Sequence, residues 1–292
     1  MTDPRDLAPG LDTTHPLHRR AIAVATMHGK ERVLAPPLRQ RLDVAILVPS
    51  QFDTDAFGTF TGSIARTGSA IDAARAKARA AMRHCGTTAA VASEGSFGPH
   101  PSLPFVPLAA ELVLLLDDTL GLEVIAEDVG TTTNFAGVTV HDHEGAQAFA
   151  ARIGFPTHQL VLSNAAAPTA TVRGIGDEAT LTRLLAEWLP RHGTVQLTTD
   201  MRADRNPTRM QAIARAAERL AARTATRCPG CRWPGWGVIA MPRGLPCALC
   251  GEPTELVRSV VTGCARCAVQ RESPRQDGRT EADPGSCPAC NP

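Results

Sequence analysis

The sequence predicts an α/β fold, a mixed sheet flanked by helices, followed by a small C-terminal zinc-ribbon module. Over residues 21–226, short apolar runs typical of buried strands alternate with segments whose apolar residues recur at helical spacing, as in α/β domains. Over residues 227–292, eight of the nine cysteines form four CxxC pairs, a spacing typical of zinc-binding modules. Residues 1–20 contain His, Pro, Asp and Arg without an apolar segment, so we expect a disordered leader rather than a secretory signal.

The composition argues against several classes of protein. A net charge of +1 argues against a protein that binds nucleic acid over its whole surface, although a local basic patch is compatible with it. No stretch approaches the roughly 18 uncharged apolar residues of a membrane span, so we expect no membrane contact and a cytoplasmic location. Aromatic residues make up only 4% of the chain and tyrosine is missing, so Ala, Leu and Val must fill the core.

The first part of the α/β region is predicted as alternating strands and helices. Apolar runs predict strands, and apolar residues three and four apart predict helices, as between Ile71 and Met82. The segment 111–128 predicts two strands joined by a turn at 118–121, which makes the sheet mixed. In chain order we expect a strand at 21–26, a helix at 30–42 interrupted by Pro36 and Pro37, a strand at 43–49, a loop at 52–68, a helix at 69–84, a strand at 87–93 and a loop at 94–104.

The second part continues the alternation. Asp177 is placed to cap one helix and Pro190 to end it, while Asn206 or Asp204 can cap another helix that opens with Pro207. The expected order is a helix at 144–153, strands at 159–163 and 169–173, a helix at 177–190, a strand at 194–199 and a helix from about 207.

The segment from Thr26 to Lys30 is the first of three places that could bind a ligand. Its sequence puts a turn between a strand and a helix, where free backbone amides and the positive helix end attract anions. Lys30 would add a point charge and His28 a hydrogen-bond donor. The chain has only two lysines among 30 basic residues, so a lysine kept here suggests a chemical role. The glycine spacing is not that of a Walker motif, and an ordinary strand–helix turn is the alternative.

The second place combines Asp72 and Lys77 on one helix with Glu94. Asp72 and Lys77 lie about 140° apart around a helix, so both can flank one edge of a cleft without touching. Glu94 follows a strand of small apolar residues, and the carboxyl ends of strands are where α/β sheets hold their ligands. Glu94 could therefore hold a magnesium ion or act as a general base. The alternative is a solvated acid on a loop.

The third place is the start of the helix near residue 207. Arg202, Arg205 and Arg209 gather there, although the positive end of a helix disfavours cations. Three guanidinium groups at such an end suggest a bound phosphate or carboxylate, because a guanidinium group can donate two parallel hydrogen bonds to such an anion. The alternative is that Asp200 and Asp204 neutralise them.

The four CxxC pairs predict two closed four-cysteine zinc sites, which are structural because no coordination position stays open. The module is too small to bury much core, so metal binding would supply its folding energy. The favoured arrangement joins the first pair with the second and the third with the fourth; an interleaved cross-brace is the other. Disulfides are disfavoured in a cytosolic chain. The eight expected zinc ligands are Cys228, Cys231, Cys247, Cys250, Cys264, Cys267, Cys287 and Cys290.

Two other features of the cysteines and their surroundings bear on function. Trp233, Trp236 and several arginines of the module could form a surface for nucleic acid or a protein partner, although a solvated basic face around the metal is the simpler interpretation. Cys85, in an Ala-rich helix end, is expected to be a small buried hydrophobe rather than a nucleophile.

Nearly the whole chain resembles an uncharacterised bacterial family, a domain of unknown function (DUF6671). The resemblance rests on "ATMHGKE", "ASEGSFGPHP", "TDMRA", "NPTRM" and the closing cysteine pairs. It implies no established activity.

Residues 22–98 also resemble, more distantly, the inosine-triphosphate pyrophosphatase family. That family opens with a strand and a turn of the type A-T-x-N-x-G-K, continues with a helix E-N-A-x-x-K-A, and then has a strand leading to an acidic loop. Both lysines fall on the positions that contact phosphate in that family. The matching segments "ATMHGK", "DAARAKA" and "SEGS" supply Ala25, Thr26, Gly29, Lys30, Asp72, Ala74, Lys77, Ala78 and Glu94.

Together these features favour an enzyme, a magnesium-dependent phosphohydrolase or pyrophosphatase acting on a nucleotide or related phosphate ester. Glu94 and Asp72 would hold metal and water. The residues expected to bind phosphate are Thr26, His28, Lys30, Lys77, Arg202, Arg205 and Arg209. The alternative is a non-enzymatic protein that binds a small phosphorylated ligand, with zinc ribbons that contact nucleic acid or a protein partner. A third interpretation is a scaffold whose ribbons only brace the domain.

Overall fold

The computed structural model describes residues 11–53, 68–101, 103–164 and 167–292. Half of the expected leader and most of the expected loop at 52–68 lie outside them. Within the described residues the strands form sheets of five, four and three strands, which confirms the mixed α/β class. None of the described helices is long and apolar enough to cross a membrane.

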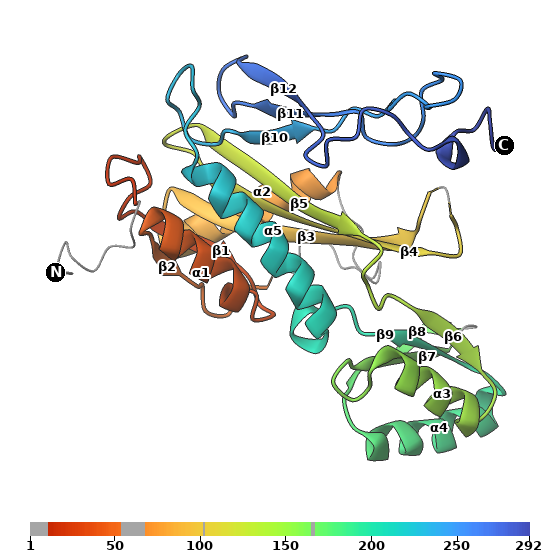
Figure 1. Cartoon of the computed structure of the whole chain (residues 1–292). Helices are drawn as coiled ribbons and strands as arrows, with labels where there is room; N and C mark the ends of the chain where they lie inside the picture. Colours follow the sequence, from red (N-terminus) through yellow and green to blue (C-terminus); the bar gives the residue numbers. More distant parts are fainter. Residues whose placement is uncertain (1–10, 54–67, 102, 165–166) are drawn as a thin grey trace.

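The five-stranded sheet is the centre of the molecule, with strand order β2-β1-β3-β4-β5 (Figure 1). β1 pairs in parallel with β2 and β3, whereas β4 is antiparallel to β3 and β5. The sheet is therefore mixed, as predicted. Its strands are β1 (Ala21–Ala25), β2 (Ala45–Leu47), β3 (Ala89–Pro99), β4 (Pro107–Asp117) and β5 (Leu122–Gly130).

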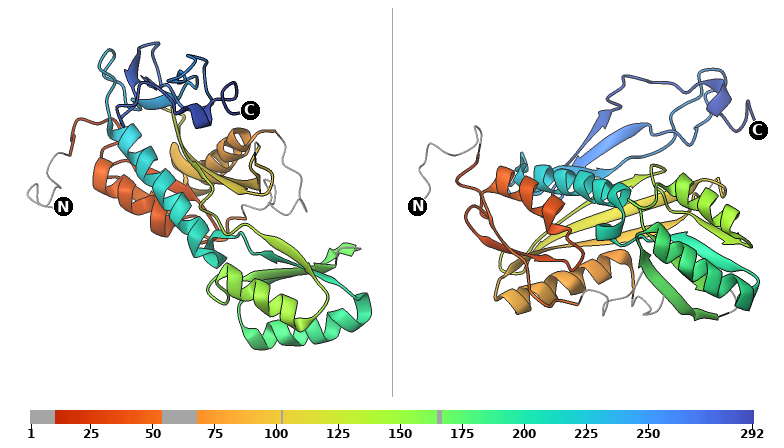
Figure 2. Two further views of the ribbon diagram at one scale, coloured as in Figure 1. Left: turned by 45° about the vertical axis from the view of Figure 1, so that its right-hand side comes forward. Right: turned by 90° about the horizontal axis from the view of Figure 1, so that it is seen from below.

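The two faces of this sheet are covered differently because alternate strand residues point to opposite sides. Ile22 and Val24 face the helices α1 and α5, whereas Ala23 and Ala25 face α2. The alanines let the Ala-rich α2 approach closely. Seen from below, α2 lies on one side of the sheet and α1 and α5 on the other (Figure 2). The covering helices are α1 (Glu31–Leu42), α2 (Ala70–Cys85) and α5 (Pro207–Ala225).

Three details differ from the sequence prediction. β3 does not end at residue 93 but continues to Pro99, because β4 pairs with it along its whole length. α1 continues through Pro36 and Pro37 without interruption. α4 (Glu178–His192) also runs past Pro190 before Gly193 ends it.

Residues 11–20, expected within a disordered leader, are packed against the folded chain. The Leu17 side chain is fully buried in the core between the sheet and α1. His15 Nε2 hydrogen-bonds to the carbonyl oxygen of Thr224 at 3.0 Å, and Asp12 forms an ion pair with Arg227 at 2.6 Å. One buried leucine and two such contacts are enough to order a short segment.

A second lobe, residues 137–199, lies within the range expected as one α/β domain. It has its own sheet, in the order β6-β9-β7-β8, and its own apolar core. Helices α3 and α4 cover one face of that sheet (Figure 1). The remaining elements of the lobe are β6 (Gly137–Val140), α3 (His143–Ile153), β7 (Leu160–Asn164), β8 (Ala167–Ile175) and β9 (Val195–Thr199).

The cysteine-rich module, residues 227–292, carries the third sheet, in which β10, β11 and β12 are antiparallel. It lies along the side of α5 and β5 (Figure 1). A short 3-10 helix, η4 (Pro284–Ser286), precedes the last cysteines. Its strands are β10 (Gly237–Ala240), β11 (Ser259–Gly263) and β12 (Gln270–Pro274).

Candidate functional site

Thr26 folds the turn between β1 and α1. Its Oγ1 accepts hydrogen bonds from the backbone N–H groups of His28 at 3.3 Å and Lys30 at 3.2 Å. Gly29 has a φ of 68°, in the left-handed region that glycine enters without strain. The turn directs the Lys30 side chain inward, where its Nζ donates to Oγ of Ser93 on β3 at 3.0 Å.

Lys77 reaches the same region from α2. Its ammonium group forms an ion pair with Glu94 of β3, and both side chains are buried. β1 ends beside this point, since its last residue, Ala25, pairs with Ala92. The two lysines of the chain therefore reach neighbouring residues of one strand from opposite faces of the sheet: Lys30 on the side of α1 and α5, and Lys77 on the side of α2. Glu94 lies inside β3, not at a strand end as predicted, because β3 continues to Pro99.

A second ion pair lies next to the first. Arg209, from the first turn of α5, donates from Nε to Glu111 Oε1 on β4 at 2.6 Å. Its Nη1 also donates to the carbonyl oxygen of Met201, and its guanidinium group lies 5.0 Å from the centre of the Phe97 ring. Glu111 is fully buried. Arg209 is thus engaged by protein groups on several sides instead of being open to a phosphate.

These side chains form what we call the lysine site: Lys30, Lys77, Ser93, Glu94, Glu111 and Arg209. It holds three cationic side chains and two carboxylates. The pKa of Lys30 is lowered from 10.5 to about 8, mainly by burial and also by the charges of Arg209 and Lys77, while Glu111 and Glu94 act in the opposite direction. Among the residues that the structure describes, no carboxylate forms an ion pair with Lys30, whose Nζ hydrogen-bonds to the Ser93 hydroxyl.

Glu111 and Ser93 belong to the lysine site but were missed at the sequence level. Glu111 is a lone acid beside the apolar run that forms β4, and it pairs in register with Gly95. A charge within an otherwise apolar strand is a usable signal, because such a charge needs a buried partner. Nothing in the sequence placed Arg209, about a hundred residues later, as that partner.

The other two predicted arginines are neutralised by acids. Arg202 Nη2 pairs with Asp200 Oδ2 at 2.6 Å, and Arg205 Nε with Asp204 Oδ2 at 3.0 Å. This is the alternative that the sequence left open for them. Asp204 also lies 3.4 Å from His28 Nδ1, so the segment after β9 contacts the Thr26–Lys30 turn.

Asp72 is placed at the N-terminus of α2, apart from the lysine site. Its Oδ2 accepts hydrogen bonds from the backbone and hydroxyl groups of Ser69, at 3.1 Å and 2.7 Å, in a capping box. It also pairs with Arg75 at 3.2 Å, and more than half of its side chain is exposed. These contacts explain Asp72 as a helix cap.

An open hollow of about 480 Å³ lies where β1 and β2 end. Open α/β sheets bind ligands at the carboxyl ends of their parallel strands. Thr26 and Gly29 belong to its wall, so it lies beside the turn that leads to Lys30. The rest of its wall combines apolar and polar side chains, among them Met27, Val48, Phe52, Glu31, Gln51 and Asp53.

The cysteines form two tetrads, each with its ligand atoms within 4.8 Å of one another. The sulfur–sulfur distances are 3.7 Å for Cys228–Cys267 and 3.9 Å for Cys247–Cys290. Four sulfurs bound tetrahedrally at about 2.3 Å from one ion lie about 3.8 Å apart, whereas a disulfide needs about 2.05 Å. Each tetrad therefore suits a tetrahedral metal ion such as zinc.

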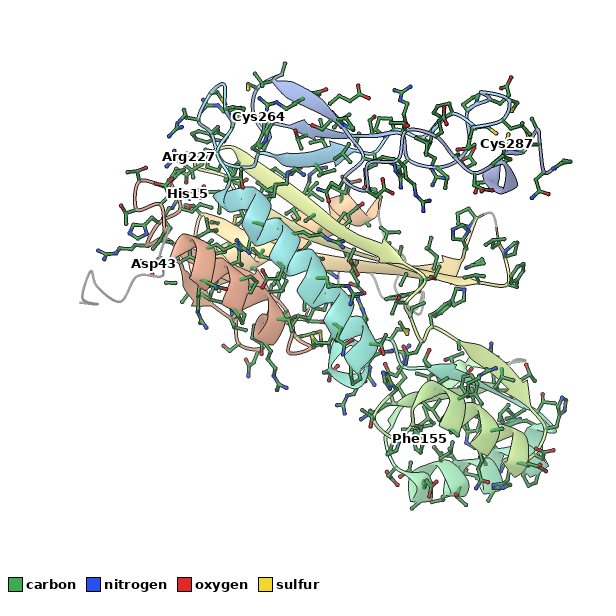
Figure 3. The ribbon with its side chains drawn as sticks, in the orientation of Figure 1. His15, Asp43, Phe155, Arg227, Cys264 and Cys287 are labelled. Atoms are coloured by element: carbon green, nitrogen blue, oxygen red, sulfur yellow. The ribbon has the colours of Figure 1, made fainter. Side chains whose placement is uncertain are left out.

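The tetrads are interleaved, so the favoured sequential pairing is wrong and the cross-brace is right. The first cysteine pair joins the third, and the second joins the fourth. The reason is the antiparallel sheet: Gly237, which opens β10, pairs with Gly263, which ends β11. The pairs before β10 and after β11 therefore meet at one end, and those after β10 and after β12 meet at the other (Figure 3 labels one cysteine at each end).

Backbone amides point at the sulfurs in each knuckle. The N–H of Gly230 donates to Cys228 Sγ and that of Leu249 to Cys247 Sγ, both at 3.4 Å. Hydrogen bonds from Cys250 and Leu249 lower the pKa of the Cys247 thiol to about 7. Such amides favour the thiolate, the form that binds metal.

The module's aromatic and basic residues are partly used inside the protein. Trp233 packs against the core between the sheet and α5, and Arg266 lies 4.2 Å from the centre of its ring. Arg243 pairs with Glu255 and Arg258 with Glu272. These contacts fit the predicted alternative of a solvated face around the metal.

The family model for a domain of unknown function (DUF6671) matches residues 77–292. No curated protein matches the chain. No solved structure matches it either. The matched part includes Lys77, the rest of the lysine site except Lys30, and both cysteine tetrads. Since the match covers well over half of its length, the chain belongs to this family of unknown function.

Proposed function

We propose that the chain binds a phosphate ester at the lysine site and hydrolyses it with magnesium, a nucleotide being the simplest substrate. The observation that carries this proposal is Lys30, a buried ammonium group whose partner is the neutral hydroxyl of Ser93. A buried charge without a counter-ion is costly. An oxyanion beside Lys30, at the edge of β3 beyond the end of β1, would supply the missing negative charge.

Other residues would complete the binding of such a ligand. Lys77 is held by Glu94 and would share its charge with a phosphate oxygen. The positive end of α1, which begins directly after Lys30, favours the same anion. The adjoining hollow of about 480 Å³ has room for the rest of a nucleotide-sized ligand.

Magnesium prefers carboxylate oxygens and keeps several of its waters. Glu94 in the lysine site and Asp53 on the wall of the hollow offer such oxygens, and we propose that they hold the ion. Asp72 fits this role less well, since its carboxylate caps α2. When bound, magnesium would reduce the charge on the phosphate and activate a water molecule.

The resemblance of residues 22–98 to the inosine-triphosphate pyrophosphatase family supports the same proposal. In that resemblance Lys30 and Lys77 fall on phosphate-contacting positions. Because Lys30 and Lys77 reach neighbouring residues of β3 from opposite faces, a shared phosphate would lie at the edge of β3 beyond the end of β1.

We further propose that both tetrads hold zinc, as structural ions in a cytoplasmic protein. Four thiolates and no open position are typical of structural zinc, and a reducing compartment keeps the thiols available. The module has eight arginines and six carboxylate side chains, and each zinc with four thiolates adds a formal charge of −2. The loaded module is therefore net negative, which disfavours nucleic acid as its partner.

Phosphate release from a panel of nucleotides with magnesium tests the enzyme. We expect turnover by the wild type and a fall of about 100-fold or more in Glu94→Gln. The matched control is Glu144→Gln, an exposed glutamate in the first turn of α3, which should keep full activity. Equal turnover in wild type and Glu94→Gln would overturn hydrolysis at this site. Saturable binding without turnover, lost in Lys30→Met, would instead identify a non-enzymatic phosphate-binding protein.

A further inference from the structure

The Arg209–Glu111 pair belongs to the lysine site, but neither residue is part of the wall of the hollow. Two bonds join the side chains, Nε to Oε1 at 2.6 Å and Nη2 to Oε2 at 3.4 Å. The carbonyl of Met201 takes the third guanidinium nitrogen, and the Phe97 ring lies beside the group. A pair held on so many sides has a fixed geometry.

This fixed pair lies on the same face of the sheet as Ser93, the hydrogen-bond partner of Lys30, because Glu111 pairs in register with Gly95, two residues beyond Ser93. From there its two charges act on Lys30. Arg209 lowers the pKa of Lys30, and Glu111 raises it. The other charged groups that act on Lys30 are Lys77 on α2 and Glu94 on β3. A shift of either partner of the Arg209–Glu111 pair would therefore change how readily Lys30 carries its charge.

Gly95 provides the space that the pair occupies. It pairs in register with Glu111 across the β3–β4 ladder. A Cβ at position 95 would lie 2.6 Å from Arg209 Nη2, 2.7 Å from Glu111 Oε1 and 3.0 Å from the Phe97 ring. Any larger residue must push the pair out of place. Gly98, three residues further along the same strand, has no such neighbour within 4 Å.

We propose that Arg209 and Glu111 are positioning residues, which fix the electrostatic surroundings of Lys30 for phosphate binding, and that Gly95 is the residue that lets them do so. The inference rests on the proposed function, because it concerns how the same site binds its anion. It also assigns Arg209 a role other than direct phosphate contact. Through the Met201 carbonyl, the pair ties the lysine site to the segment that leaves β9 of the second lobe.

The test compares two alanine substitutions on one strand. Binding of inorganic pyrophosphate is measured by calorimetry between pH 6 and 10 for wild type, Gly95→Ala and Gly98→Ala. We expect wild-type affinity to fall with a midpoint near the pKa of Lys30, about 8. Gly95→Ala should bind at least about tenfold more weakly, which corresponds to about 1.4 kcal/mol. Gly98→Ala should match the wild type.

A second variant, Glu111→Gln, changes the charge of the pair. If the pair had only a structural role, this variant would not shift the pH midpoint of pyrophosphate binding. Glu111→Gln removes a negative charge that favours protonated Lys30, so the midpoint should move to lower pH. If circular dichroism shows that Gly95→Ala does not fold, the midpoint of Glu111→Gln still tests the positioning role.

The two proposals fail in different ways. The positioning role would be overturned if Gly95→Ala and Gly98→Ala bound pyrophosphate equally well, or if Glu111→Gln kept the wild-type pH midpoint. Neither result would contradict the proposed phosphate site. If the wild type binds neither pyrophosphate nor any nucleotide, the proposed function fails and the positioning role fails with it.

Discussion

The buried ammonium group of Lys30 lies 3.0 Å from the hydroxyl of Ser93 on β3. Burial disfavours its charged form and lowers its pKa to about 8. A lysine in this position is unfavourable for folding alone, whereas it is well placed to meet an anion. The effects of Lys30 on the stability of the fold and on anion binding should therefore be opposite, and both can be measured.

Replacing Lys30 by methionine should stabilise the protein at pH 7 while removing phosphate binding. The folded state disfavours the charged lysine, so its loss should raise the free energy of unfolding by about 1–3 kcal/mol. The gain should shrink between pH 8 and 10.5, because wild-type folding releases the lysine proton there and becomes more favourable as the pH rises. Urea unfolding at pH 7 and pH 10 measures both values. A variant less stable than wild type at pH 7 would contradict this account of Lys30.

Phosphate binding should be accompanied by proton uptake above pH 8. An oxyanion stabilises the ammonium form of Lys30, so its pKa should rise from about 8 when the anion binds. Calorimetry at pH 8.5 in two buffers with different ionisation enthalpies gives the number of protons taken up. We expect a value between about zero and one for the wild type. The same binding heat in both buffers would show that no group changes its protonation.

The Lys77–Glu94 ion pair should show strong coupling in a double-mutant cycle. Lys77→Met alone leaves a buried carboxylate without its cation and should destabilise the protein by about 3–5 kcal/mol. Adding Glu94→Gln removes that charge and should recover much of the loss. Thermal or urea unfolding of the four proteins gives the coupling energy. Additive effects of the two substitutions would mean that the pair contributes nothing beyond its separate side chains.

Local sequence signals predicted most elements of the fold. Ser69, Asp177 and Asn206 cap the helices that follow them through side-chain hydrogen bonds, and each of these helices begins where the sequence places it. The length of β3 could not be predicted from residues 94–99, which contain two glycines and resemble a loop. Its strand conformation depends on pairing with β4, a partner that local sequence does not reveal.

The lysine site was predictable only in part. The scarcity of lysine marked Lys30 and Lys77, and a lone acid after small residues marked Glu94. Arg202 and Arg205 were selected for the same reason as Arg209, yet nearby aspartates neutralise them. Which of several arginines reaches a buried acid depends on tertiary packing. For the cysteines, spacing predicted the ligands, whereas their pairing followed from strand order.

The two metal tetrads should contribute unequally to the stability of the α/β part. Cys231→Ser and Cys250→Ser each remove one exposed cysteine, one from each tetrad, and each variant should retain one of two zinc equivalents by elemental analysis. Around the first tetrad, Trp233 and Ala265 pack against the main core. Loss of that metal should therefore loosen the core itself.

The same end of the module is tied to α5 and β5 by Arg223, which donates to the carbonyl oxygens of Gly235 at 3.3 Å and Ile125 at 2.8 Å. Cys231→Ser should consequently lower the unfolding free energy of the α/β part by roughly 2–4 kcal/mol. Cys250→Ser should leave it within about 0.5 kcal/mol, because the second tetrad lies at the far end of the three-stranded sheet, away from that core. Urea unfolding followed by hydrogen exchange of the β1 amides, a probe outside the module, separates the two effects. Equal shifts in both variants would show that the module responds to metal loss as one unit, with no special tie between the first ion and the core.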